Sequence, residues 1–114
     1  MIKSKLLTFA LVLAPVFAMA HSGSEGTTPA DGSIVTQVPA LSMRFDDPMR
    51  IISVVLTSPT GQVAIDRETG MDPSKEFRAT PAQELAPGLY RFDWHGMASD
   101  GHPMQGSFSF TVAE

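Results

Sequence analysis

The sequence predicts an all-β protein built as a two-sheet sandwich with Greek-key connections. Apolar and polar residues alternate over several short runs, which is the period of half-buried strands. Nine prolines and nine glycines fall mostly between these runs, where they favour turns and leave little room for a helix. Short strands with regular turns in about 100 residues are typical of a sandwich.

The first 20 residues, MIKSKLLTFALVLAPVFAMA, are interpreted as a secretory signal peptide rather than as part of the fold. Lys3 and Lys5 give a positive start, residues 6–17 are almost wholly apolar, and Ala18–Ala20 match an A-x-A cleavage pattern. The apolar run is shorter than the ~20 residues of a spanning helix, so no stable membrane insertion is expected. We therefore expect an exported protein whose mature chain, residues 21–114, is a single domain.

Four later segments carry the strand pattern in chain order, and the stretch around residues 28–35 is expected to pair with the sheet they form. Residues 41–45, 88–94 and 106–112 alternate, with aromatic or aliphatic side chains on one face. Residues 50–58 are more continuously apolar, as expected for a strand near the middle of a sheet. The turns between them are predicted at residues 29–32, 58–61, 67–74 and 85–88.

Charge and cysteine content exclude several classes of function. Loss of Lys3 and Lys5 with the leader changes the net charge from −4 to −6, which argues against nucleic acid and anionic membrane surfaces as partners. The absence of cysteine excludes disulfides, iron–sulfur clusters, blue-copper sites and cysteine-ligated zinc.

Three residues form a candidate metal site. Cleavage after Ala20 would make His21 the first residue, so that its α-amine and imidazole together could chelate an ion. Asp100 and His102 in the sequence SDGHP add a carboxylate and a second imidazole. Such nitrogen and oxygen donors suit one Cu(II) ion per chain, although zinc also accepts them. Alternatively, the D-G-H sequence is only a turn, since Asp and Gly favour that geometry.

Taken together, the mature N-terminal histidine, TPADGSIV, PALSMRFDDPM and LAPGLYRFDWHGMASDGHPMQGSFSFTV resemble the CopC family of periplasmic copper-binding proteins over the whole mature chain. The resemblance implies an immunoglobulin-like Greek-key sandwich or barrel of about seven strands. It also implies a Cu(II) site made by His21, Asp100 and His102, and a role in copper homeostasis or resistance, often with an inner-membrane copper permease as partner.

Methionines and the other histidine depart from the family pattern. Many members carry a Met-rich central loop that binds Cu(I), whereas residues 57–74 contain only Met71. Met43 falls on an apolar strand face and is expected in the core. Met97 and Met104 flank the SDGHP turn, and we hypothesise that one of them lies near the metal. His95 is predicted on the solvated face of its strand, opposite the face of Trp94, which is predicted to be a packing centre.

Three functions compete at this stage. The favoured one is a copper carrier or buffer without catalysis. The second is a copper-dependent oxidase whose histidine brace attacks polysaccharide, but the aromatics here occupy alternating core positions rather than a flat sugar-binding surface. The third is a metal-independent exported immunoglobulin-like interaction module, in which the histidines are incidental.

Overall fold

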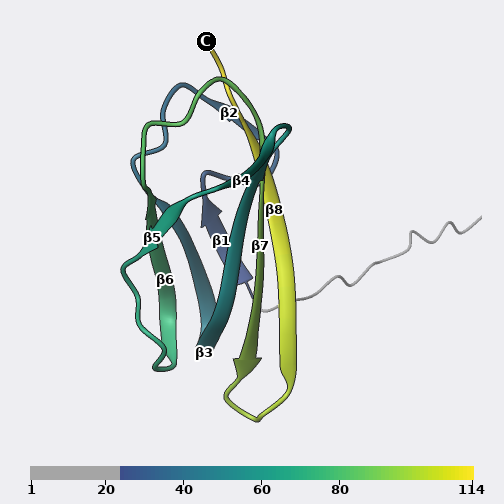
Figure 1. Ribbon diagram of the computed structural model, residues 1–114. Helices are drawn as coiled ribbons and strands as arrows, with labels where there is room; N and C mark the ends of the chain where they lie inside the picture. The colour runs from purple at the N-terminus through teal and green to yellow at the C-terminus, as the bar shows by residue number, and fades with distance from the viewer. Residues whose placement is uncertain (1–23) are drawn as a thin grey trace, which may run out of the picture.

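The computed structural model describes residues 24–114, and all the regular structure in that range is β-strand (Figure 1). None of these residues belongs to a helix that is long and apolar enough to cross a bilayer. Position His21 and the predicted leader lie outside the described residues. The strands are β1 (Ser24–Thr28), β2 (Ser33–Val35), β3 (Leu41–Ser58), β4 (Gly61–Val63), β5 (Ile65–Arg67), β6 (Ser74–Pro81), β7 (Gly88–Ala98) and β8 (Pro103–Val112).

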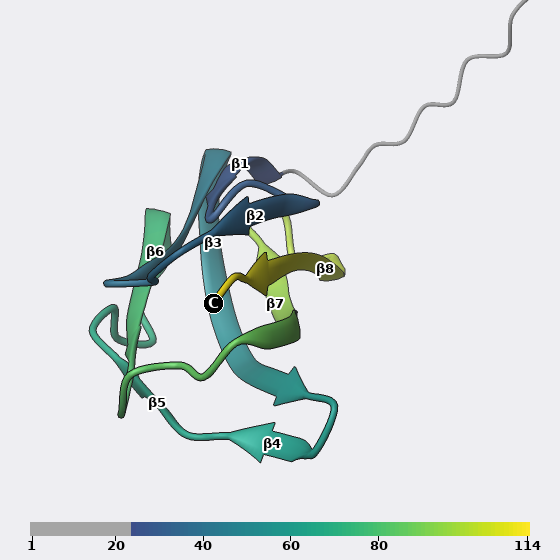
Figure 2. The ribbon, with the colours of Figure 1, turned by 90° about the horizontal axis from the view of Figure 1, so that it is seen from above.

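Strand β3 is the centre of the fold, because its two halves belong to two different parts of the sheet. Residues 41–45 pair with β1 and β6, and residues 49–58 pair with β7 and β4. The register with β6 shifts between Arg44 and Met49, and Pro48 lies inside that irregular stretch, where no ladder partner requires an N–H group. Seen from above, the sheet curls around the core (Figure 2).

The sheet runs in the order β2-β8-β7-β3-β6-β5, with β1 and β4 added beside β3. All pairs are antiparallel except β2 with β8, which are parallel. The connection from β1 to β2 is hydrogen-bonded to the last strand, β8. In this connection Asp31 Oδ1 accepts a hydrogen bond from Ser109 N at 2.9 Å, and Gly32 N donates to Ser109 O at 2.7 Å. The first and last segments of the domain are therefore joined directly.

The core is aromatic, and its two walls face each other as predicted for a sandwich. Phe45 on β3 meets Trp94 on β7 edge-to-face at 5.4 Å, and Phe77 on β6 packs at 6.3 Å from Phe92 on β7. Trp94 is 2% exposed, which confirms it as a packing centre. Met43 is fully buried, also as predicted. The buried aromatic faces of β7 and β8 are the ones that the alternation indicated.

The structure differs from the expected strand list in three ways. Residues 24–114 hold eight strands where about seven were expected, and β2, β4 and β5 among them are only three residues long. Strand β6 (Ser74–Pro81) lies in a segment for which no strand was predicted. In addition, residues 41–45 and 50–58 are not separate strands but parts of the continuous β3. The register with β6 shifts between Arg44 and Met49, where the chain passes from one half of the sheet to the other.

Candidate metal centre

The β7–β8 hairpin ends in a tight turn at residues 99–102, which holds two of the three predicted metal ligands. Ala98 N donates to His102 O at 2.9 Å, and Gly101 N donates to Ala98 O at 2.9 Å. Gly101 has a φ of 92°, a conformation that other residues rarely adopt, so glycine is required for this shape of turn. The connection between β7 and β8, which contains Asp100 and His102, lies at the lower end of the molecule (Figure 1).

Asp100 and His102 contact each other through both side chain and backbone. His102 Nδ1 lies 2.9 Å from Asp100 Oδ2, and His102 N donates to Asp100 Oδ1 at 3.1 Å. The side chain of Asp100 is 66% exposed and that of His102 is 75% exposed. When His102 is neutral, this contact favours the proton on Nδ1, so Nε2 is the nitrogen with a free lone pair.

The electrostatics of the turn keep Asp100 ionised. The side-chain hydrogen bond from His102, and then the one from the His102 backbone N–H, hold the pKa of the Asp100 carboxyl below its ordinary value of 3.8. Hydrogen bonds to the charged form of a carboxyl stabilise that form. At neutral pH the turn thus offers an anionic oxygen donor next to an imidazole.

The start of β1 lies at the same end of the molecule as this turn. Residues 42–44 of β3 have β1 on one edge and β6 on the other, whereas Met49 has β7 on one edge and β6 on the other. Strands β1 and β7 therefore follow one another along the same edge of β3. Ser24 pairs with Phe45 and Ala98 pairs with Met49, so three residues of β3 lie between the partners of the two strand ends.

This register bears on the third predicted ligand. His21 lies outside the described residues, three positions before Ser24. Three residues of extended chain span at most about 10 Å. A donor at position 21 therefore lies within about 10 Å of Ser24, the residue of β1 that pairs with Phe45.

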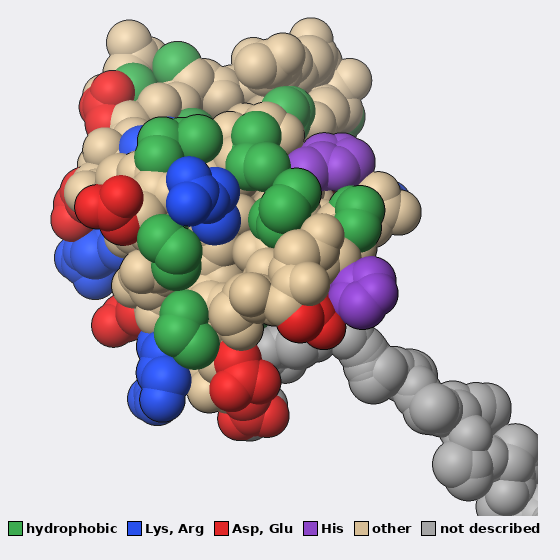
Figure 3. Space-filling model, turned by 90° about the horizontal axis from the view of Figure 1, so that it is seen from below, with side chains coloured by type: hydrophobic (Ala, Val, Ile, Leu, Met, Phe, Trp, Pro, Cys, Tyr) green, Lys and Arg blue, Asp and Glu red, His purple; other side chains and the backbone are tan. Residues whose placement is uncertain are grey.

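Two carboxylates that the sequence reasoning did not single out lie between these strand ends. Asp46 and Asp47 are both exposed and occupy the stretch of β3 between the partners of Ser24 and Ala98. The sequence signal was the DDP triplet, which interrupts the alternation of its strand. Seen from below, acidic side chains lie close to histidine on this end of the molecule (Figure 3). The negative charge of Asp46 and Asp47 attracts cations to the end of the molecule that holds the turn.

Within residues 24–114 no three histidine or acidic side chains converge as a ready metal site. Asp100 and His102 are the pair that the structure brings together. His95 is exposed, as predicted, and Met97 on the same face of β7 is 37% exposed. Met104 instead packs partly buried against the core, so the two methionines that flank the turn point to opposite faces. The hypothesis that one of them lies near the metal stays a prediction.

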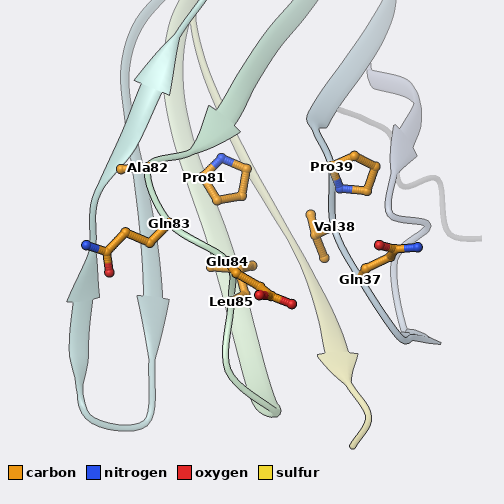
Figure 4. A pocket seen from close by; sticks show the side chains of 8 residues that line it. All are labelled: Gln37, Val38, Pro39, Pro81, Ala82, Gln83, Glu84 and Leu85. Carbon is orange, nitrogen blue, oxygen red and sulfur yellow. The ribbon is translucent and has the colours of Figure 1, made fainter.

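One hollow of the surface lies away from the turn. A shallow groove of about 350 Å³ is found at the opposite end, between the segment before β3 and the segment after β6 (Figure 4). Its residues are Gln37, Val38, Pro39, Pro81, Ala82, Gln83, Glu84 and Leu85. Glu84 is the one ionisable side chain among them, which makes the turn, rather than this groove, the candidate functional site.

Comparison with known proteins gives one consistent result. The family model described as the CopC domain matches residues 24–113. The chain is 30% identical over 119 residues to copper resistance protein C of Escherichia coli, with 94% of each chain covered. It is 31% identical to copper resistance protein C of Pseudomonas syringae pv. tomato, with 89% of this chain and 87% of that protein covered. The crystal structure of PcoC, a methionine rich copper resistance protein from E. coli, superposes with a TM-score of 0.67 at 28% identity, over 82% of this chain and 99% of that chain.

Proposed function

The chain belongs to the CopC family, and from this premise we propose that it is an exported copper-binding protein of copper homeostasis or resistance. In this proposal residues 1–20 are a cleaved leader, and residues 21–114 form one domain that binds one Cu(II) ion through His21, Asp100 and His102. The protein carries or buffers copper in the periplasm and performs no catalysis. Copper is thus its cargo.

One observation carries the proposal: β1 and β7 pair with the same edge of β3, and their ends nearest the Asp100–His102 turn, Ser24 and Ala98, pair with Phe45 and Met49. A free terminus at His21 would add an amine and a second imidazole beside an exposed carboxylate and imidazole. The complete set then holds three nitrogens and one oxygen, which matches the tetragonal preference of Cu(II). Binding requires the α-amine to lose its proton, so affinity should fall as the pH is lowered.

Loading the site requires the Asp100–His102 contact to adjust. Asp100 Oδ2 faces His102 Nδ1 in the described structure, and His102 Nε2 is the ring nitrogen left for an ion. Asp100 can bind copper through one oxygen while the other still accepts the His102 backbone N–H. The turn therefore needs a side-chain rotation rather than a backbone rearrangement.

As a carrier, the protein should pass copper on to another protein and should not catalyse a reaction. A carboxylate ligand occupies a position that oxygen chemistry would need to be open. The inner-membrane copper permease suggested by the family resemblance is the partner we propose for delivery. Sustained production of hydrogen peroxide by the reduced copper form, with cleavage of polysaccharide, would instead favour the oxidase.

The test is a Cu(II) titration of correctly processed protein, followed by visible and EPR spectroscopy. We expect one equivalent with a nitrogen-rich tetragonal signal. A variant with one glycine added before His21 should lose that signal, and D100N and H102Q should each weaken binding at least tenfold. D66N is the matched control, since it removes an exposed carboxylate on β5 that has no part in the proposed site, and it should change affinity less than twofold.

Equal, weak binding by the processed and the extended chains would overturn the proposed site. The SDGHP sequence would then be a turn only, and the exported interaction module would become the working hypothesis. Tight binding that survives the added glycine but is lost in H102Q would reject the role of the N-terminus while keeping copper as cargo.

A further inference from the structure

We propose that His95 and Met97, on the outer face of β7, form a second metal site that takes a soft monovalent ion of the Cu(I) or Ag(I) class. The site shares no donor with the one proposed for Cu(II). It can therefore be tested whether or not the N-terminal site exists.

The geometry follows from the alternation of β7. Gly96 is buried and faces the core side, so the side chains of His95 and Met97 both leave the strand on the solvent side. Residues two apart on a strand are separated by about 6.6 Å. An ion lying above Gly96 is thus within reach of an imidazole nitrogen and a thioether sulfur.

The exposure of Met97 is the observation that needs a reason. Methionine usually fills gaps in a core, as Met43 and Met49 do here at 0% and 5% exposure. Met97 is 37% exposed on the outer face of a regular strand, next to an exposed imidazole. Thioether sulfur is a soft donor that selects Cu(I), and imidazole suits copper in either oxidation state.

The neighbours of His95 allow it to act as a ligand. Its cross-strand partners are Ser53 on β3 and Gln105 on β8, and both carry oxygens that can accept a hydrogen bond from one ring nitrogen. A hollow of about 250 Å³ opens beside His95, lined also by Gln105 and Ser107. No hydrogen bond or ion pair engages the His95 ring among residues 24–114. One nitrogen can therefore be held in orientation while the other binds an ion.

The positive charge of Arg50 opposes cation binding at this site and can be used to test it. Arg50 is the cross-strand partner of Met97 on β3 and is exposed. A guanidinium on that side repels a monovalent cation, although solvent screens the effect. Removing this charge should strengthen binding, whereas removing a donor should weaken it.

The experiment uses the mature chain with one glycine added before His21, so that the proposed Cu(II) site is disabled. Protein labelled with ¹³C at the methionine methyl groups is titrated with Ag(I), and then with Cu(I) under reductant. We expect the Met97 methyl and the His95 ring signals to shift together at one equivalent, while the Met71 methyl does not move.

The variants test each donor separately. M97L and H95Q should each weaken Ag(I) binding at least tenfold, and R50Q should tighten it a few-fold. M71L is the matched control, because Met71 is 48% exposed and has no place on the outer face of β7, and it should change affinity less than twofold. The unchanged methyl signal of buried Met43 reports that each variant is folded. An unshifted Met97 methyl, or equal weakening by M71L and M97L, would overturn the proposal.

Discussion

The close approach of β3 and β7 at Gly96 predicts a large cost for the smallest possible substitution there. A Cβ atom at this position would lie 2.6 Å from Arg50 O and 3.4 Å from Ile51 Cδ1. Real Cβ atoms do not approach a carbonyl oxygen so closely, and a backbone atom in a paired strand cannot rotate away as a side chain can. The G96A variant must therefore push the two strands apart.

The magnitude follows from the cost of overpacking. Forcing an extra carbon into a closely packed site costs about 1–3 kcal/mol, and we expect G96A in the upper half of that range because the contact is with backbone. For a domain of this size each kcal/mol corresponds to about 4–8 °C in Tm, so a loss of about 2–3 kcal/mol should lower the melting temperature by about 8–24 °C. The variant should still fold, since small domains have about 5–15 kcal/mol of stability.

Urea unfolding followed by Trp94 fluorescence and by circular dichroism measures this change. G70A is the matched control, because a Cβ at Gly70 meets no atom within 4 Å, and its free energy of unfolding should stay within about 0.5 kcal/mol of the parent. A loss below about 0.5 kcal/mol in G96A would show that the two strands can separate freely, and would refute this reasoning.

Three further predictions concern the turn, the closure of the sheet and the core. The folded-state pKa of Asp100 is lowered, so its contact with His102 contributes stability that is fully present above the ordinary value of 3.8 and is lost as the pH falls through the folded pKa. NMR titration of the metal-free protein should show the lowered pKa of Asp100, and H102Q should return it toward 3.8. D31A removes the acceptor of Ser109 N and should cost about 1 kcal/mol in urea unfolding, whereas an unchanged midpoint would mean that water replaces the carboxylate without loss. Phe92 is fully buried, so F92A should cost about 3–5 kcal/mol, and a cost below about 1 kcal/mol would show that the core collapses around the missing ring.

The sequence allowed the strand faces to be predicted, because alternation is a local property. Tyr90, Phe92 and Trp94 are buried and His95 is exposed, as a period of two requires. Strand pairing is not local, and here the prediction was incomplete. Nothing in residues 33–35 indicates a parallel partner, and nothing around Pro48 indicates that one strand serves both halves of the sheet.

The candidate site was predictable in part for the same reason. Asp100 and His102 are two residues apart around a glycine, so their contact could be expected from sequence. The positions of Asp46 and Asp47 could not, since they depend on the pairing of β1 and β7 with one edge of β3. His21 remains a prediction from the leader pattern and the family resemblance.

The parallel pairing of β2 with β8 has a consequence for the order in which the protein can be completed. A chain is made from its N-terminus, so β2 emerges long before its partner, Phe110–Val112, exists. No intermediate length of the nascent chain can close the sheet, and contacts of such long sequence separation form slowly. Strand β2 therefore has no partner on the edge that pairs with β8 until the last strand has been made. A premature stop after the β7–β8 turn would leave the aromatic faces of β7 uncovered, so truncated products should aggregate rather than persist as partial domains.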